Sequence, residues 1–285
     1  MVPLIGDPIG HVTGPSLFNK VFDANGINAI CLPTKVEKGK IPEFIKSLKY
    51  LNCPGFIVTM PHKRDILSIV DKMDDISRIF RSINSVHIYE DGTLEGRGLD
   101  GKSAVSAICE GFDLAGKSVM MIGAGGISGV IGAELAEKGA RKLVILNRTL
   151  EKAQAVSAVL EDRTNLEVAC APLTVENANK IAESADCFIN ATCLGMKGIA
   201  EDYADLSFME LLPKSACVLE VITNPPETSV VKKARALGLK TFMGMDMQAA
   251  ATGVISEFVL GTKVDDSSRD AARQFYCDMF KYTRK

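Results

Sequence analysis

Gly123-Ala124-Gly125-Gly126-Ile127-Ser128 directly follows the apolar run Lys117–Ile122 and opens a helical pattern toward Ala136. In such a strand–turn–helix, Gly123 permits the tight turn, Gly125 lets the backbone approach a pyrophosphate, and Ser128 keeps helix and strand close. The N–H groups and dipole of the helix start stabilise phosphates. We therefore predict a dinucleotide site; the alternative is a purely structural glycine-rich turn. The cofactor-binding residues expected in this turn are Gly123, Ala124, Gly125, Gly126 and Ile127.

Short apolar runs alternate with helical patterns on the C-terminal side of this turn. Strands are expected at 117–122, 142–146, 166–171, 187–190 and 217–221, and helices near 127–139, 149–161, 175–184 and 228–238. This alternation predicts βαβ units with right-handed crossovers, and hence a Rossmann-type doubly wound parallel sheet.

The N-terminal hundred residues show a second α/β pattern. Strands are expected at 2–6, 29–32, 55–59 and 85–89, helices at 16–25, 41–51 and 102–111, and a hairpin turn at Asp91-Gly92-Thr93. After Gly244, two helical patterns at 247–261 and 266–284 have no strands of their own, so we expect them to pack back on one domain. The chain is therefore predicted to be a two-lobed α/β protein. Its domains are an N-terminal α/β domain at 1–102, joined by the helices of 245–285, and a Rossmann domain at 103–244.

Composition excludes several classes of function. A chain of 285 residues with 47% apolar and 24% charged residues has the profile of an ordinary globular protein of about two domains. With 33 basic and 35 acidic residues there is no excess positive charge for nucleic-acid binding. No apolar run approaches the roughly 18 residues of a membrane span, and no secretory signal opens the chain. We expect a cytoplasmic protein with a small-molecule substrate, no nucleic-acid or membrane partner, and a monomeric or homodimeric state.

The cysteines and histidines do not form a metal-binding pattern. Eight cysteines are scattered without a Cys-x-x-Cys pair, and the three histidines are His11, His62 and His87. We therefore expect no metal site, and we interpret the cysteines as small buried apolar residues.

The residues after the second strand of the Rossmann pattern indicate which dinucleotide binds. NAD enzymes place an acidic residue there to accept a hydrogen bond from the ribose 2′-hydroxyl. This chain has Asn147-Arg148-Thr149 instead, followed by Lys152. The planar guanidinium of Arg148 suits a 2′-phosphate, so NADP is favoured and NAD remains open. The alternative is that Arg148 stacks on adenine or lies in solvent.

Seven motifs in order resemble the shikimate/quinate dehydrogenase family; they run from Gly6 to Thr228, and the resemblance continues to Gly261. They are Gly6-Asp7-Pro8-Ile9-Gly10-His11, Val58-Thr59-Met60-Pro61-His62-Lys63, Ile83-Asn84-Ser85, Asp100-Gly101, Asn147-Arg148-Thr149, Asn190-Ala191-Thr192-x-x-Gly195-Met196 and Asn224-Pro225-x-Glu227-Thr228.

This resemblance implies a two-domain enzyme whose N-terminal lobe binds substrate, whose Rossmann lobe binds NADP or NAD, and whose last helices return to the first lobe, with a cleft between the lobes. The family's catalytic Lys and Asp carry over to Lys63 and Asp100, and its substrate-binding residues to Thr59 and Asn84. His11 and His62 lie beside the catalytic position, and we interpret them as structural. Further cofactor-binding residues implied by the resemblance are Asn147, Arg148, Thr149, Lys152, Asn190, Ala191, Thr192, Val221, Gly244 and Met247.

The implied pair also fits the chemistry. Reduction of a ketone builds negative charge on its oxygen, which an ammonium stabilises and protonates, and a neighbouring carboxylate orients that ammonium. Taken alone, Lys63 and Asp100 could equally be two ordinary exposed charges, because sequence does not show that they are close together.

The chain departs from the family pattern where shikimate is normally bound. Two serines that bind the substrate carboxylate are replaced by Val12 and Gly14, and Thr13 between them or Gln248 offers a partial substitute. Because each hydrogen bond to a charged carboxylate is worth about 1.5–3 kcal/mol, shikimate should bind poorly. The other replaced polar positions are Ile57, Gly98, Thr223 and Ala251.

We therefore predict a shikimate dehydrogenase-like oxidoreductase that transfers hydride reversibly between NADP(H) and a ring hydroxy acid or keto acid, with altered specificity. Two rivals remain open. One is another NADP-dependent dehydrogenase of similar two-lobe architecture, such as a folate dehydrogenase or a thioester reductase. The other is a non-catalytic nucleotide-binding regulator.

Overall fold

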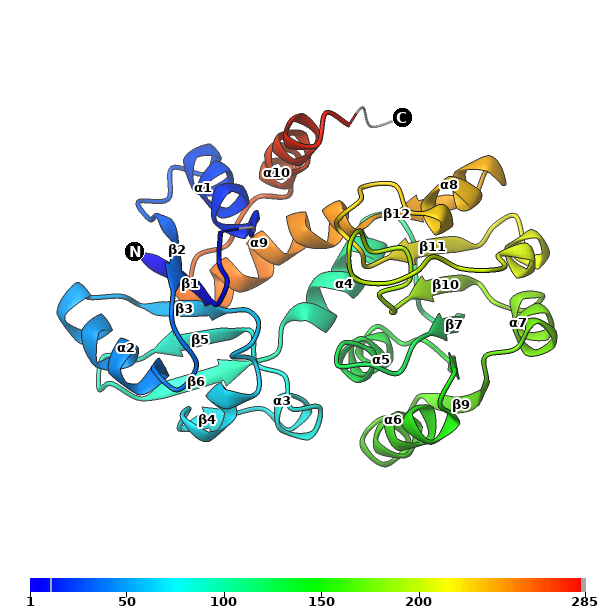
Figure 1. The fold of residues 1–285 in the computed structure, drawn as a ribbon, viewed down its shortest axis with the longest axis horizontal. Coiled ribbons are helices and arrows are strands. Elements are labelled where there is room, and N and C mark those ends of the chain that lie inside the picture. The colour runs from blue at the N-terminus through cyan, green and yellow to red at the C-terminus, as the bar shows by residue number, and fades with distance from the viewer. Residues whose placement is uncertain (11, 283–285) are drawn as a thin grey trace. The chain divides into compact units, whose positions relative to one another are not determined.

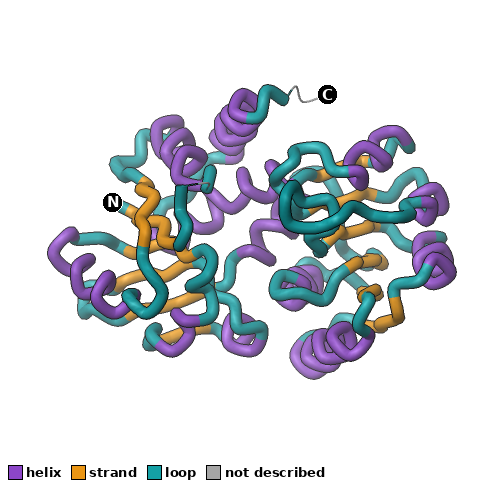
Figure 2. The backbone as a smooth tube through the Cα atoms, in the orientation of Figure 1, coloured by secondary structure: helices purple, strands orange, loops and turns teal. Residues whose placement is uncertain are grey.

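A computed structural model describes residues 1–10 and 12–282, which divide into two compact units. Unit 1 comprises Met1–Asp100 and the chain from Gln248 onward, and unit 2 comprises Gly101–Met247. Each unit contains a six-stranded sheet with helices packed around it (Figures 1 and 2). The α/β fold predicted from the sequence is therefore confirmed. None of the described helices is long and apolar enough to cross a bilayer.

The sheet of unit 1 is mixed. Its strands are β1 (Val2–Gly6), β2 (Cys31–Lys35), β3 (Gly55–Val58), β4 (Lys72–Met73), β5 (Ser85–Ile88) and β6 (Leu94–Arg97), in the order β2-β1-β3-β5-β6-β4. Strand β1 runs parallel to β2 and β3, whereas β5 runs antiparallel to both β3 and β6. The predicted hairpin at Asp91–Thr93 joins β5 to β6, closed by the Tyr89 N–H donating to the Thr93 carbonyl at 2.9 Å.

Five α-helices belong wholly or largely to unit 1, and apolar spacing explains how they pack. They are α1 (Gly14–Ala24), α2 (Ile41–Leu48), α3 (Asp75–Ile79), α9 (Gly244–Leu260) and α10 (Asp266–Met279). Helix α1 buries Leu17, Phe18, Val21 and Phe22 along one face, and α10 lies beside it (Figure 1). Helix α9 places Val254, Ile255 and Val259 in the same apolar cluster as Val2 and Leu4 of β1.

The sheet of unit 2 is entirely parallel, as the βαβ pattern predicts. Its strands are β7 (Ser118–Ile122), β8 (Lys142–Asn147), β9 (Glu167–Pro172), β10 (Cys187–Asn190), β11 (Cys217–Glu220) and β12 (Lys240–Phe242), in the order β12-β11-β10-β7-β8-β9. The helices are α4 (Asp100–Cys109), α5 (Ser128–Glu137), α6 (Leu150–Arg163), α7 (Val175–Ala182) and α8 (Ser229–Ala236). The chain builds outward from β7 through β8 and β9, then returns to place β10 on the other side of β7. Ligands bind at such a reversal, outside the carboxyl ends of the strands.

Several predicted boundaries differ from the observed ones, and the short elements β4, α3 and β12 were not expected. The strand expected at 29–32 is β2 at Cys31–Lys35, and β12 was not expected as a strand. The helix expected at 41–51 ends at Leu48 and continues as a 3₁₀ turn over Lys49–Leu51, after which Asn52 adopts a left-handed conformation with φ of 47°. A three-residue strand such as β12 has too few residues to show a period of two.

Candidate functional site

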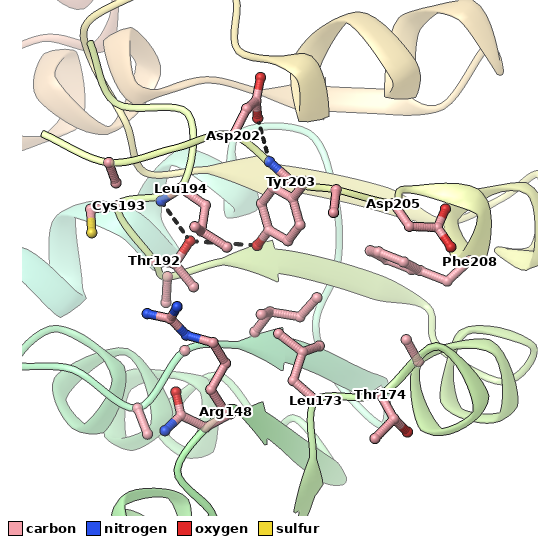
Figure 3. Close-up of a pocket in the computed structure, with 18 of the residues that line it drawn as sticks. Arg148, Leu173, Thr174, Thr192, Cys193, Leu194, Asp202, Tyr203, Asp205 and Phe208 are labelled. Atoms are coloured by element: carbon pink, nitrogen blue, oxygen red, sulfur yellow. Dashed lines mark hydrogen bonds between the residues drawn. The ribbon is translucent and has the colours of Figure 1, made fainter. Parts of the chain in front are cut away.

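A cavity of about 800 Å³ opens at the carboxyl ends of β7, β8, β9 and β10 in unit 2 (Figure 3). Several residues predicted from sequence to bind the cofactor line this cavity. These are Gly123, Ala124, Gly125, Asn147, Arg148, Thr149, Lys152, Ala191 and Thr192. They come from the ends of three separate strands, so the fold brings together segments up to about seventy residues apart.

The glycine-rich turn forms the floor of the cavity. Gly123 has a φ of +117°, and a Cβ there would lie 2.7 Å from the Ala191 carbonyl oxygen, so only glycine fits. The Gly125 N–H donates to the Ser128 hydroxyl at 3.1 Å, which fixes the turn against the first residue of α5. At Gly125 and Gly126 a Cβ would meet nothing within 4 Å, so the space above the turn is open to a ligand. Gly126 and Ile127 lie in the same turn but not on the cavity lining.

The end of β8 supplies the positive charge of the cavity. Arg148 and Lys152 are exposed on its edge, and Figure 3 shows Arg148 facing the loop that carries Thr192. The Asn147 side chain donates to the Thr149 carbonyl at 2.7 Å and so orders this corner. Thr149 is the N-cap of α6 but its hydroxyl makes no cap hydrogen bond. Two cations and a hydroxyl at one corner are the donor set that a phosphate monoester requires.

Sequence reasoning missed the wall opposite Arg148. Residues 200–208 contribute Tyr203, Asp205 and Phe208, the turn between β9 and α7 contributes Leu173, and α7 contributes Ala178. Figure 3 shows the Tyr203 ring beside Thr192. The loop of 193–206 has no regular periodicity, so the only signal for its position was its place after β10, at the sheet reversal.

Asn190, which the family resemblance assigned to cofactor binding, lies behind this wall. Its side chain is completely buried and is absent from the cavity lining. Its Oδ1 accepts hydrogen bonds from the Thr192 N–H at 3.1 Å, the Thr192 hydroxyl at 2.8 Å and the Tyr203 hydroxyl at 2.8 Å. Asn190 therefore holds two residues of the wall in place.

Val221, Gly244 and Met247 also lie outside the cavity lining. A Cβ at Gly244 would lie 2.2 Å from the Ile222 carbonyl oxygen, so the start of α9 packs directly on the segment after β11. Met247 is buried, whereas Val221 is partly exposed.

In unit 1, Lys63, Asp100 and Asn84 form a hydrogen-bonded chain. The Lys63 Nζ lies 2.6 Å from Asp100 Oδ2, and the Asn84 Nδ2 donates to Asp100 Oδ1 at 2.7 Å. Asn84 is 4% exposed and its Oδ1 accepts the Leu99 N–H at 2.8 Å, so the carboxylate has a rigid support. The side chains of Lys63 and Asp100 remain 32% and 23% exposed, which leaves them accessible to a ligand.

The other residues predicted to bind the substrate lie in different elements and have different hydrogen-bond partners. Thr59 follows β3, and its N–H donates to the Ile5 carbonyl at 2.9 Å. Thr13 is the N-cap of α1 without a side-chain cap bond, and Gln248 is half-buried on α9, three residues before Ala251 on the same helix face. The buried His62 ring bonds the Val36 carbonyl at 2.7 Å. His11 lies outside the described residues.

The replaced positions are largely apolar in the structure. Val12, Ile57 and Ala251 all belong to the apolar cluster around Val2 and Leu4. At Gly98, a Cβ would lie 2.2 Å from the Ser82 carbonyl oxygen, so the backbone itself excludes a side chain there. Among the described residues, no three of His, Cys, Asp and Glu are grouped as a metal would require.

Comparison with known families accounts for this combination of features. Residues 4–86 match the model of the shikimate dehydrogenase substrate binding domain, and residues 104–202 match that of shikimate / quinate 5-dehydrogenase. The shikimate dehydrogenase (NADP(+)) of Alkaliphilus metalliredigens is 32% identical over 251 residues, which is 87% of this chain and 86% of that protein. The corresponding enzyme of Bacillus subtilis is 31% identical, covering 86% of this chain and 85% of that protein.

Two solved structures are similar over almost the whole chain. The ligand-free 5-ketofructose reductase of Gluconobacter sp. strain CHM43 has a TM-score of 0.87 and 27% identity, covering 98% of both chains. A shikimate dehydrogenase in complex with NADP+ has a TM-score of 0.80 and 26% identity, covering 99% of this chain and 96% of that one.

The hydrogen bonds that Asn84 makes to Asp100 and Leu99 predict that its removal lowers the stability of the protein. Asn84→Ala should lower the free energy of unfolding by about 1–3 kcal/mol, because the buried Leu99 N–H and one Asp100 oxygen lose their partners. Urea unfolding followed by circular dichroism measures this. Asn177→Ala, which removes exposed bonds on α7, serves as the control and should change stability by less than about 0.5 kcal/mol. Equal effects of the two substitutions would contradict the assigned support.

Proposed function

The chain belongs to the shikimate/quinate dehydrogenase family, and we propose that it is an NADP-dependent oxidoreductase that interconverts a CH–OH group and a ketone on a substrate other than shikimate. The observation that carries this proposal is the chain of hydrogen bonds from Asn84 through Asp100 to Lys63. It presents a restrained ammonium beside a fixed carboxylate, which is what proton transfer to a carbonyl oxygen requires.

Lys63 and Asp100 have distinct roles in this mechanism. The Lys63 ammonium stabilises the negative charge that develops on the ketone oxygen and donates the proton that completes the alcohol. Asp100 accepts one Lys63 N–H and leaves the other two free to face the substrate oxygen. In the oxidative direction, Lys63 accepts the hydroxyl proton. Asn84 fixes Asp100, and through it the direction of the ammonium.

The cavity of unit 2 fits NADP(H). Bound there, the cofactor supplies or accepts the hydride. The turn at Gly123–Ile127 would receive the pyrophosphate, whose charge the α5 N-terminus would stabilise. Arg148, Lys152 and Thr149 would bind the 2′-phosphate, and no acidic residue at the end of β8 would compete for the ribose hydroxyl.

The proposed substrate site of unit 1 offers fewer polar contacts to a shikimate-like substrate than the family pattern does. Val12 and Gly14 offer no hydroxyl to a carboxylate, and Val12, Ile57 and Ala251 add apolar surface. Two substrate classes follow. A ring hydroxy acid or keto acid related to shikimate or quinate is the class that family membership favours. A neutral polyhydroxy ketone is favoured by the similarity to 5-ketofructose reductase, since such a substrate needs no carboxylate ligands.

A turnover screen with NADPH and NADP+ separates these classes. The panel should contain shikimate, quinate, their keto acids, neutral ring polyols and ketoses, together with folate and thioester substrates for the rival dehydrogenases. Turnover of any member excludes a non-catalytic nucleotide-binding regulator. Turnover only of folates or thioesters would favour the rival dehydrogenases of similar architecture.

The role of Lys63 predicts a selective loss of turnover. Lys63→Ala should lower kcat by about 10²-fold or more, because a general acid contributes about 10²–10⁴-fold, while NADPH affinity stays within a few-fold. Steady-state kinetics with the best panel substrate and NADPH fluorescence titration measure both. The exposed Lys102→Ala on α4 is the matched control. A Lys63→Ala variant that keeps more than roughly a tenth of the wild-type rate would exclude this role.

The 2′-phosphate assignment predicts a selective change in cofactor affinity. Arg148→Ala should weaken NADPH binding about tenfold or more, because a charge-assisted hydrogen bond is lost, and leave NADH binding within about twofold. The two cofactors are titrated against both proteins, with the exposed Arg163→Ala at the end of α6 as control. Tighter wild-type binding of NADH, with a silent Arg148→Ala, would mean that Arg148 is wrongly assigned.

The replaced carboxylate ligands predict that shikimate is a poor substrate. Introducing Val12→Ser and Gly14→Ser together should raise kcat/KM for shikimate while NADPH affinity is unchanged. The second change requires only that the end of the Leu4 side chain shifts, because a Cβ at Gly14 would meet Leu4 Cδ1 at 2.9 Å and no other atom. The pair is made together, since neighbouring pocket residues are not additive. A wild-type kcat/KM for shikimate of about 10⁴ M⁻¹s⁻¹ or above would refute the expectation.

A further inference from the structure

A second carboxylate, with no part in the steps above, is completely buried in unit 2. Glu220 is the last residue of β11 and is 0% exposed. It lies directly opposite Asn190, the last residue of β10, in the parallel register of the two strands. Both residues therefore stand at the carboxyl edge of the sheet, where the cofactor cavity opens.

Hydrogen-bond donors surround Glu220. The Asn190 Nδ2 lies 3.0 Å from each carboxylate oxygen, the Thr228 hydroxyl donates to Oε2 at 2.7 Å, and the Ile222 N–H donates to Oε1 at 3.0 Å. Because a buried carboxylate is costly without such donors, this set of donors stabilises an acid at this position.

The bond to Glu220 also fixes which way the Asn190 amide points. With its Nδ2 turned to Glu220, Asn190 presents Oδ1 to the Thr192 N–H, the Thr192 hydroxyl and the Tyr203 hydroxyl. A reversed amide would place an NH₂ group against these three donors and leave Glu220 facing an oxygen. The acceptor character of Glu220 thus sets the orientation of Asn190, and Asn190 sets the positions of Thr192 and Tyr203 on the cavity wall. Figure 3 shows these two residues side by side, facing the Arg148 side of the cavity.

We propose that Glu220 is a positioning residue for the nucleotide cofactor, acting through Asn190 to fix Thr192 and Tyr203 on the wall of the binding cavity. The proposal rests on the proposed function, in that it takes the cavity to bind NADP(H). Glu220 itself touches no cofactor. Through Thr228 and Ile222, the same carboxylate ties the segment after β11 to the end of β10.

Binding of NADPH, followed by its fluorescence, tests the proposal without knowledge of the substrate. Glu220→Gln should weaken NADPH binding about tenfold or more, because the new amide opposes the Asn190 NH₂ with an NH₂ of its own. Asp186→Asn is the matched control. Asp186 precedes β10 at the opposite edge of the same sheet and accepts the Ser118 N–H at 2.9 Å, so its change to an amide should alter NADPH binding by less than about threefold.

A double variant that exchanges the acid and the amide between positions 220 and 190 is also informative. It tests whether NADPH binding requires the hydrogen bond between these two side chains or only a buried acid at position 220. In Glu220→Gln combined with Asn190→Asp, the new Gln amide can donate to the new Asp carboxylate, whose other oxygen still accepts from Thr192 and Tyr203. This variant should recover NADPH affinity to within about threefold of wild type, whereas Asn190→Asp alone should not, because two carboxylates would then face each other. Tyr203→Phe removes a single hydroxyl from the wall and should weaken NADPH binding about threefold or more; it provides the test if Glu220→Gln does not fold.

The pH dependence of stability supplies a readout that identifies Glu220 directly. Burial raises the pKa of the Glu220 carboxyl from 4.5 to about 7, and it outweighs the lowering by Asn190, Ile222 and Thr228. A group whose pKa is higher in the folded than in the unfolded state stabilises the fold at low pH and loses that contribution as the pH rises through the folded value. The urea midpoint of the wild type, relative to that of Glu220→Gln, should therefore fall between pH 5 and pH 8. Among the described residues, the titratable group that interacts electrostatically with Glu220 is Tyr203 on the loop after β10, and Tyr203 is unchanged in both proteins.

The outcomes are decisive in either direction. A wild-type protein that does not bind NADPH overturns the cofactor assignment together with this proposal. A wild type that binds NADPH, while Glu220→Gln or Tyr203→Phe binds it equally well, overturns the role of Glu220 alone. An exchange variant no better than Glu220→Gln also overturns it. A midpoint difference independent of pH would contradict the raised pKa of Glu220 but not the hydrogen bonds on which its role rests.

Discussion

The close approach of Gly123 to Ala191 is the constraint on which the nucleotide site depends. The strands β7 and β10 are neighbours, and the turns that follow them meet so tightly that a single Cβ would lie 2.7 Å from a carbonyl oxygen. Because the two turns are in contact, the glycine-rich floor and the Thr192 wall belong to one rigid edge. The open space lies above Gly125 and Gly126, where a Cβ would meet no neighbour. The position of the cavity is therefore a consequence of the strand order, because the order in which the chain adds strands reverses at β7.

Sequence predicted this edge well because its signals are local. The turn at Gly123–Ser128 has a fixed spacing, the residues after β8 lack an acid, and five of the six strands in unit 2 are long enough to show apolar runs. The wall around Tyr203 and the acid at Glu220 could not be found in this way. Their positions depend on the register of β10 with β11 and on the course of an irregular loop, and neither leaves a periodic pattern.

In unit 1, the sequence indicated which residues form the site, but only the fold shows that they lie close together. Lys63, Asn84 and Asp100 are spread over 38 positions, and only the antiparallel pairing of β5 with β3 and β6 explains why they meet at 2.6 Å and 2.7 Å. Shared spacing to a known family could suggest the set, but composition and periodicity could not. The same holds for Val12, Ile57 and Ala251. The sequence shows that they are apolar, but only the structure shows that they lie in one cluster.

The backbone at Gly98 restricts which side chains this position can carry. The Gly98 N–H donates to the Ser77 hydroxyl at 2.7 Å, and a Cβ there would lie 2.2 Å from the Ser82 carbonyl oxygen. A mutation that returned the family's asparagine to this position would be harmful unless the segment around Ser77 and Ser82 had already moved. At Gly14 the only obstacle is the end of the flexible Leu4 side chain, so a serine could return there in one step. A side chain at Gly14 therefore requires only that the end of Leu4 shifts, whereas one at Gly98 requires the backbone around Ser82 to move.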